Sequence, residues 1–419
     1  MQFEIIDIDK KGRGVSREGI SFRFAYPEDI IEGYIISKRN KLGRFEKVIK
    51  DSPLRKNAPC KYAGQCGGCP WQQLKYENQL KIKEEKIKGL FGFCEPIIPA
   101  PQEFFYRNRM DFAFGPDFSI GLKDDKNKTL DIEKCWLLSE DSNEIVARLR
   151  EFIKSSDLRS YPEGIMRHVV IREGKNIKNT ILSILTSDKG EFPLEELWEE
   201  LKDVVQGITW SHNLSPADRS YGEIQKSIGQ DYLLESLNKI KFKIPVQSFF
   251  QTNTKQAERL IQIITEFANL KGDEKVFDLY SGTGSIGLSL AKKAKEIIGI
   301  EENEAATKLS LENAELNGME NFSAIAGRVE DVIKSLDLKS DKIILDPPRP
   351  GIHKKVLQKI VEAKPKEIVY ISCNPNTQRE DINLFLEGGY HIKKIQPIDM
   401  FPHTPHIENV VLLKHLASM

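Results

Sequence analysis

The sequence has no apolar run close to the roughly 20 residues that a membrane-spanning helix needs. Its first residues also lack the basic and then apolar pattern of a secretory signal, so we expect a cytoplasmic protein with no membrane partner. Net charge is absent as well, because 62 Lys and Arg residues balance 62 Asp and Glu residues. A polyanionic partner would therefore have to bind local basic patches, since the whole molecule offers it no attractive field.

Cysteine is scarce, with six residues in a chain of 419, which argues against a disulfide framework. Three of the six, Cys60, Cys66 and Cys69, nevertheless fall in one short glycine-rich stretch. Glycine lets a backbone fold tightly around a metal centre, so this stretch predicts a metal site. Cys135 is the expected fourth ligand, because Cys94 lies in an apolar context typical of a core residue.

Four thiolates suit either a tetrahedral zinc ion or an iron–sulfur cluster. Most structural zinc sites draw their ligands from two close pairs, whereas this set consists of a compact triad and one distant cysteine. The spacing therefore favours a cluster, with zinc as the alternative.

A chain of this length is too long for one core, so we expect two or three domains. Residues 1–55 alternate between apolar and polar side chains and predict a small β-barrel. Residues 56–243 are predicted as a central α+β domain and residues 244–419 as an α/β Rossmann-like domain. The barrel has basic residues that suit oligonucleotide binding, although they could equally form a solvated rim. They are Lys38, Arg39, Lys41, Arg44, Lys47 and Lys50.

Two apolar runs in the last domain, 343–345 and 368–371, are typical of buried parallel strands. The first is followed by Asp-Pro-Pro-Arg, which begins at Asp346, and the second by Ser-Cys-Asn-Pro, which contains Cys373. Ligands of open parallel sheets bind beyond the carboxyl ends of the strands. A carboxylate and a thiol are therefore expected at one ligand-binding edge.

The same domain contains a nucleotide-binding turn with Gly282, Gly284 and Gly287, and Glu301 ends the next strand. This fingerprint suits NAD as well as S-adenosylmethionine. Asp278 places a carboxylate just under the turn, which favours a cationic ligand over a pyrophosphate. Cys373 favours methylation of carbon, because a thiolate that adds to carbon 6 of a pyrimidine makes carbon 5 nucleophilic.

Taken together, the motifs resemble those of the RNA 5-methyluridine methyltransferases over essentially the whole chain. The resemblance implies a TRAM domain (an OB-like RNA-binding barrel) at the start, a [4Fe–4S] cluster, S-adenosylmethionine as methyl donor and uridine C5 as target. It rests on the barrel-like start, Cys60, Cys66 and Cys69 with Cys135, and the motifs at 250–253, 278–284, 346–351, 372–375 and 406–410.

The resemblance also implies roles for single residues. Cys373 is expected to attack carbon 6, in a site that favours its thiolate, and Glu408 to remove the carbon 5 proton. His403 and His406 lie near Glu408 in sequence but are weaker candidates for this base. Asp346 is expected to hold the donor or the base.

Three further residues are expected at the ligand. Gln251 would offer a polar edge, Glu301 would bind the donor ribose, and Tyr280 would pack near the methionine end.

The expected substrate is structured RNA, 23S ribosomal RNA before tRNA, bound by a monomer with its target base flipped or unfolded. The alternatives are a tRNA 5-methyluridine methyltransferase, a 5-methylcytosine enzyme, a non-catalytic RNA-binding protein and, more remotely, an NAD-dependent oxidoreductase.

Overall fold

The computed structural model describes residues 1–215, 217, 219–338 and 340–418. Its first five strands close into a barrel in the order β1-β2-β3-β5-β4, which confirms the predicted barrel. Phe22 fills the barrel so tightly that a Cβ on Gly43 would lie 2.1 Å from its ring. The strands are β1 (Gln2–Ile8), β2 (Gly14–Ser16), β3 (Ser21–Phe22), β4 (Ile30–Ser37) and β5 (Leu42–Lys50).

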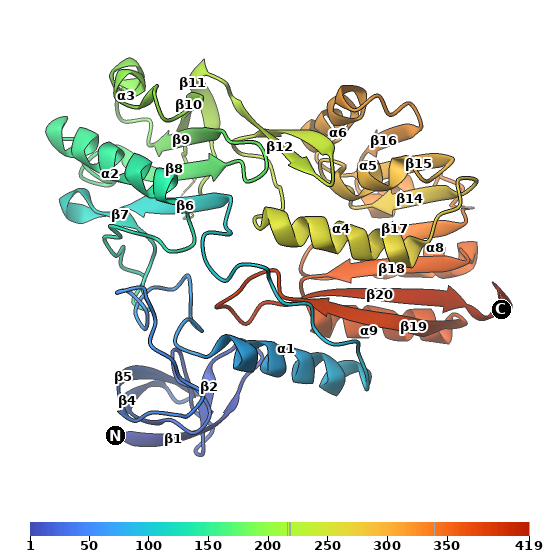
Figure 1. Ribbon diagram of the computed structural model, residues 1–419, viewed down its shortest axis with the longest axis horizontal. Coiled ribbons are helices and arrows are strands. Elements are labelled where there is room, and N and C mark those ends of the chain that lie inside the picture. The colour runs from blue at the N-terminus through green and yellow to red at the C-terminus, as the bar shows by residue number, and fades with distance from the viewer. Residues whose placement is uncertain (216, 218, 339, 419) are drawn as a thin grey trace.

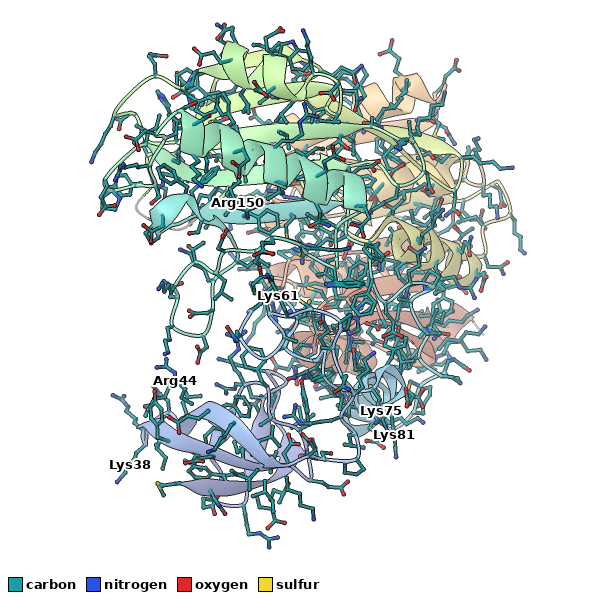
Figure 2. All side chains as sticks on the ribbon, turned by 60° about the vertical axis from the view of Figure 1, so that its left-hand side comes forward. Lys38, Arg44, Lys61, Lys75, Lys81 and Arg150 are labelled. Carbon is teal, nitrogen blue, oxygen red and sulfur yellow. The ribbon has the colours of Figure 1, made fainter. Side chains whose placement is uncertain are left out.

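Two of the basic residues predicted on the barrel are paired with acids. Arg44 lies 3.0 Å from Asp125 of the central part, and Lys47 lies 2.9 Å from Glu32. Figure 2 shows Arg44 on the side of the barrel that faces the central part, and Lys38 at the outer end of the barrel.

Helix α1 (Tyr76–Phe91) runs between the barrel and the C-terminal sheet (Figure 1). It ends at Gly92, whose left-handed φ of 85° lets its N–H bond the Lys88 carbonyl. Ile87 and Phe91 pack into the same core as helices and strands of the C-terminal sheet.

The central part is a six-stranded sheet in the order β11-β10-β9-β8-β6-β7 (Figure 1). Apolar residues of α2 and α3, including Leu149 and Leu197, share one core with the strands. The elements are β6 (Arg109–Phe114), η1 (Pro116–Phe118), β7 (Ile120–Gly121), α2 (Glu140–Ser155), β8 (Met166–Glu173), β9 (Thr180–Thr186), α3 (Leu194–Leu201), β10 (Gly207–His212) and β11 (Glu223–Gly229). A hairpin of β12 (Tyr232–Leu237) and β13 (Ile240–Pro245) leads into the last part.

A seven-stranded sheet with the order β16-β15-β14-β17-β18-β20-β19 forms the C-terminal part. Alternate residues of its strands point to opposite faces, so Val276 packs towards α4 and α5 whereas Phe277 packs towards α8 and α9. Both faces are buried, which explains the continuous apolar runs in the sequence.

The elements of this part are α4 (Thr254–Ala268), β14 (Lys275–Leu279), α5 (Ser285–Ala291), β15 (Glu296–Glu301), α6 (Glu304–Leu316), β16 (Phe322–Ala326), α7 (Val329–Val332), β17 (Lys342–Leu345), α8 (Lys354–Ala363), β18 (Glu367–Ser372), α9 (Pro375–Glu387), β19 (Tyr390–Ile398), β20 (Glu408–His415) and η2 (Leu416–Ser418).

One strand departs from the predicted parallel arrangement. β20 runs antiparallel to both β18 and β19 and lies between them. Its residues Val410 to Leu413 are buried like those of the parallel strands. The apolar pattern therefore does not distinguish a parallel strand from an antiparallel one. The division of the chain after residues 55 and 243 remains a prediction. Among the described residues, no helix is long and apolar enough to cross a membrane.

A buried ion pair joins α1 to the loop that precedes β20. Lys83 Nζ lies 2.6 Å from Asp399 Oδ1, and both side chains are fully buried. Burial lowers the pKa of Lys83, whereas Asp399 raises it. Nearby, the Gln79 side chain accepts a hydrogen bond from the His403 N–H at 2.8 Å, and the Trp71 N–H donates to the His403 carbonyl at 2.9 Å.

Replacing only one partner of this pair leaves a buried charge uncompensated, so we expect Lys83→Met to lower the free energy of unfolding by about 3–5 kcal/mol. Adding Asp399→Leu should restore most of this loss, because an apolar pair of similar volume needs no desolvation of charge. Thermal unfolding followed by circular dichroism measures both effects. A single variant as stable as the parent protein would contradict the account.

Candidate active site

The nucleotide-binding turn is folded over a buried carboxylate. Asp278 Oδ2 accepts a hydrogen bond from the Gly287 N–H at 2.9 Å, which ties the strand β14 to the start of α5. Gly282 and Gly284 have left-handed φ values of 54° and 81° that the turn requires. Asp278 Oδ1 is buried and has no hydrogen-bond partner among the described residues. The turn therefore offers a free carboxylate oxygen to a cationic group of a ligand.

Glu301 lies beside the same turn, at the end of β15. Its two carboxylate oxygens accept hydrogen bonds from the Gly282 and Asn303 N–H groups, each at 2.9 Å. These bonds fix the carboxylate, and an ionised carboxylate keeps further lone pairs for a ligand hydroxyl. Tyr280, half-buried with φ of 65°, follows β14 in the turn. Both residues thus lie at the nucleotide turn, and their roles towards the donor stay predictions.

The pairing of β18 with β20 brings Cys373 and Glu408 together. Ser372 pairs with Asn409 in an antiparallel register, so the next residues, Cys373 and Glu408, face each other at the end of the ladder. Asp346 directly follows β17, the neighbour of β18 on its other side. The thiol and the two carboxylates therefore gather at one edge of the sheet, 27 residues or more apart in sequence.

The loops that hold Cys373 and Asp346 are tied to each other. The Asn374 side-chain amide donates to the Arg349 carbonyl at 3.2 Å, and the Asn374 N–H bonds Ser372 Oγ at 3.1 Å. Pro375 then starts α9 at a position where a missing N–H costs nothing. Together these contacts set the turn that presents the thiol.

Burial, and after it the proximity of other acids, raises the pKa values of the carboxyls in this site. Burial raises the pKa of Glu408 well above its ordinary value, and the nearby Asp346 raises it further. Burial raises the pKa of Asp346 to about 7. The pKa of Asp278 also rises to about 7, from burial first and then from Asp346. Without a ligand, these carboxyls therefore keep their protons up to a higher pH than exposed carboxyls do.

The pKa of the Cys373 thiol is higher than we expected for a nucleophile. Burial, followed by Glu408 and Asp346, raises the pKa of Cys373 to about 11, while Arg349 and a backbone hydrogen bond act to lower it. The protein alone therefore disfavours the thiolate that we expected. A positive charge brought in by a ligand would shift the balance towards the thiolate.

Two further predicted residues lie in loops: Gln251 between β13 and α4, and His403 between β19 and β20. The Gln251 carbonyl accepts a hydrogen bond from the Asn108 amide at 2.9 Å, while no described residue bonds its side chain. Asn253, two residues later, caps α4 and donates to the Met400 carbonyl at 3.0 Å. His403 is buried, and its pKa falls to about 3 because burial disfavours its charge. This makes His403 a structural residue and supports its lower rank as a base.

The four predicted metal ligands, Cys60, Cys66, Cys69 and Cys135, line one small cavity of about 20 Å³. Cys94 does not line it. Within the part of the chain that the structure describes, no three Cys, His, Asp or Glu side chains are arranged to hold a single metal ion.

The surroundings of these sulfurs nevertheless suit thiolate ligands. The Gly68 N–H donates to Cys66 Sγ at 3.4 Å, and backbone N–H groups of Tyr62 and Ala63 act to lower the pKa of Cys60. Burial has the larger effect and raises the pKa of all four thiols. Bonds from N–H to sulfur are a recurrent feature around iron–sulfur clusters. The donor set therefore fits such a centre, although the predicted cluster itself is not confirmed.

Comparison with known proteins identifies the family. A model of the tRNA (uracil-5-)-methyltransferase family matches residues 75–416. The chain belongs to this family. The tRNA (uracil(54)-C(5))-methyltransferase of Pyrococcus furiosus is 36% identical over 98% of both chains. An uncharacterised RNA methyltransferase of Nanoarchaeum equitans is 39% identical over 99% of this chain and 93% of its own.

A solved structure agrees with the sequence relatives. The Pyrococcus abyssi tRNA (uracil-54, C5)-methyltransferase in complex with S-adenosyl-L-homocysteine superposes with a TM-score of 0.85 at 32% identity. The match covers 99% of this chain and all of that chain. As a member of this family, the protein is an RNA (uracil-C5) methyltransferase.

Some residues that shape this methyltransferase site were not predicted from the sequence. Gln378 on α9 donates to the Asn409 carbonyl and accepts from the Asn409 amide at 2.8 Å, which holds β20 next to β18. Arg349 belongs to a predicted motif but had no assigned role, although its charge acts on Cys373. A lone glutamine in a helix gives no signal that sequence reasoning could use.

The raised pKa of Asp278 predicts how stability depends on pH. Because its folded pKa of about 7 lies above the ordinary 3.8, the folded state binds a proton between about pH 4 and 7 that the unfolded state does not. Its contribution to stability is complete below pH 4 and is lost as pH rises through 7. Between pH 5.5 and pH 8 the contribution of Asp278 to the free energy of unfolding falls by about 2 kcal/mol.

We therefore expect the free energy of unfolding of ligand-free Asp278→Asn protein to fall by about 2 kcal/mol less than that of the parent protein between pH 5.5 and pH 8. Denaturant unfolding at both pH values measures this difference. The lowered pKa values of His403 and His406 act in the opposite direction but are common to both proteins, so they cancel. Identical pH profiles would show that Asp278 is ionised throughout.

Proposed function

We propose that this methyltransferase acts on tRNA and transfers the methyl group of S-adenosylmethionine to carbon 5 of the uridine that corresponds to position 54. The proposed chemistry rests on the register of β18 and β20, whose last pair is Ser372 with Asn409, so that the next residues, Cys373 and Glu408, face each other. The substrate is inferred from the relatives of Pyrococcus, whose names specify uracil 54 of tRNA. These relatives favour tRNA over the 23S ribosomal RNA that we had expected, for which no support was found.

Cys373 provides the nucleophile. Its sulfur forms a bond to carbon 6 of the uracil ring, and the electron pair of the 5,6 double bond moves towards carbon 5 and the carbonyl oxygen at position 4. Carbon 5 can then accept a methyl group, which S-adenosylmethionine supplies when bound. The thiol must first lose its proton, and a positive charge near Asp278 and Asp346 would offset the acids that raise the pKa of Cys373.

Glu408 completes the reaction as a base. After methylation, carbon 5 carries both a methyl group and a hydrogen, and Glu408 takes that hydrogen as a proton. The electron pair restores the 5,6 double bond and expels the Cys373 sulfur. The raised pKa of Glu408 makes it a stronger base than an ordinary carboxylate once it has lost its proton.

The donor site is assigned to the nucleotide turn. Asp278, with its unpaired buried oxygen, fits a cationic group of the donor, and Glu301 fits the ribose hydroxyls. Tyr280 lines the methionine end and Asp346 lies between donor and target. Gln251 contributes an amide that can recognise a base edge. A buried carboxylate under the turn counts against the pyrophosphate of NAD.

Methylation of purified RNA tests this function. With labelled S-adenosylmethionine, we expect label at C5 of the corresponding uridine in a tRNA transcript and none in a 23S ribosomal RNA fragment. Label in the ribosomal fragment alone would overturn the substrate assignment. Absence of label in both would overturn the function.

Glu408→Gln should lose turnover and accumulate a covalent protein–RNA adduct, because methylation proceeds while release of the sulfur requires loss of the carbon 5 proton. Denaturing gels and intact mass spectrometry detect the adduct. Cys373→Ala is the matched control and should give neither adduct nor product. A Glu408→Gln variant with normal turnover would remove Glu408 from the mechanism.

We also propose that Cys60, Cys66, Cys69 and Cys135 hold a [4Fe–4S] cluster. The four side chains line one cavity, and a cluster needs its thiolates further apart than a single ion does. The expected result is brown protein after anaerobic purification, with close to four iron and four sulfide per chain. Cys135→Ser should lose this content, whereas Cys94→Ser should keep it. Colourless protein with stoichiometric zinc would refute the cluster.

A further inference from the structure

A second cavity, of about 420 Å³, lies beside the proposed catalytic edge where the barrel, α1 and the loop before β20 meet. Two of its lining residues are neighbours of catalytic ones: Asn376 lies three residues after Cys373, and Ile407 directly precedes Glu408. Its volume lies in the range of small-molecule binding sites. The mechanism proposed above makes no use of this cavity.

Two lysines that form no ion pair with a described residue line this cavity. Lys10 and Lys86 line it, and Lys86 Nζ donates only a long bond of 3.5 Å to the Lys10 carbonyl. No described carboxylate lies within 4.0 Å of either lysine, in contrast to Lys83, which Asp399 neutralises at 2.6 Å. Burial lowers the pKa of Lys86, Arg349 and then Lys10 and Lys83 lower it further, and Asp9 acts in the opposite direction without forming an ion pair with it. These charges repel each other and would be stabilised by an anion.

The acids of the cavity are largely occupied elsewhere. Asp9 lies 2.6 Å from Arg13, and Glu85 lies 3.9 Å from Lys81. Asp7 accepts a hydrogen bond from the N–H of the next residue at 2.7 Å. Two of the three acids that line the cavity are therefore paired with basic residues outside its lining.

The rest of the wall is apolar and rigid. Trp71 lines the cavity, and its indole N–H is fixed by a bond of 2.8 Å to the Gly12 carbonyl. Leu90, Pro405 and Ile407 add aliphatic surface. An apolar wall beside cations suits an unstacked base with its phosphate.

We propose that this cavity receives a nucleotide next to the target uridine, with its phosphate against Lys86 and its base against the apolar wall. The inference rests on the proposed RNA methylation and assigns the cavity a positioning role in it. A target uridine inserted at Cys373 requires the adjoining backbone to leave its helix. Asn376 and Ile407 line the cavity close in sequence to Cys373 and Glu408, so a nucleotide that adjoins the target can reach the unpaired lysines of the lining.

Removing the charge of Lys86 tests the phosphate contact. Lys86→Gln should raise the KM for tRNA about tenfold with kcat changed less than twofold, and should reduce the salt dependence of tRNA binding by about one phosphate contact. Lys86→Arg should restore most of the affinity. Lys81→Gln is the control, because Lys81 lies on the same helix (Figure 2), has a 73% exposed side chain and does not line the cavity.

Filling the cavity tests the base contact. Gly89 lines it, and a Cβ built there would meet no atom within 4 Å, so Gly89→Trp can enter the cavity without a backbone clash. This variant should bind tRNA at least tenfold more weakly while S-adenosylmethionine binds as before. Glu77→Trp places the same bulk on an exposed residue of α1 outside the cavity and should bind tRNA like the parent.

The outcomes separate this inference from the proposed function. If the parent protein methylates tRNA and both Lys86→Gln and Gly89→Trp match it in KM and affinity, the cavity is not an RNA subsite and the function stands. If the parent protein methylates no RNA, the function fails first. Equal losses in Lys86→Gln and Lys81→Gln would indicate general charge attraction and overturn the specific contact.

Discussion

The antiparallel pairing of β18 with β20 is the constraint on which the site depends. It places the buried Glu408 opposite the half-buried Cys373 and near Asp346, where desolvation raises the pKa of each acid. Burial disfavours ionised carboxyls and like charges repel each other, so the protein alone holds the pKa of both acids above their ordinary values. This arrangement suits a reaction in which a cationic donor arrives, neutralises the acids and thereby favours the thiolate.

The loop before β20 is held by a helix from a distant part of the chain. Gln79 and Lys83 of α1 bond His403 and Asp399, and Trp71, two residues after the cysteine-rich stretch, bonds His403 as well. The same helix carries Lys86 at the neighbouring cavity. Through α1, the geometry of the catalytic edge is linked to the barrel and to the four-cysteine site.

The sequence predicts best those features in which a local pattern marks a strand and reactive or glycine residues directly follow it. The barrel, the nucleotide turn and the placement of Cys373 beyond β18 follow from local patterns. Glu408 came only from family resemblance, because a single carboxylate after a loop carries no signal. The antiparallel β20, the raised pKa of Cys373 and the unpaired Lys86 depend on contacts between distant segments, which no local pattern records.

The central claim is a transient bond between Cys373 and carbon 6 of uracil, broken only after a proton leaves carbon 5. tRNA that contains 5-fluorouridine at the target position tests it most directly, since fluorine cannot leave as the proton does. With S-adenosylmethionine present, the account predicts a stable adduct whose proteolytic fragment carries the methylated nucleotide on Cys373. Mass spectrometry that finds the nucleotide on another residue, or finds no adduct although ordinary tRNA is methylated, would contradict it.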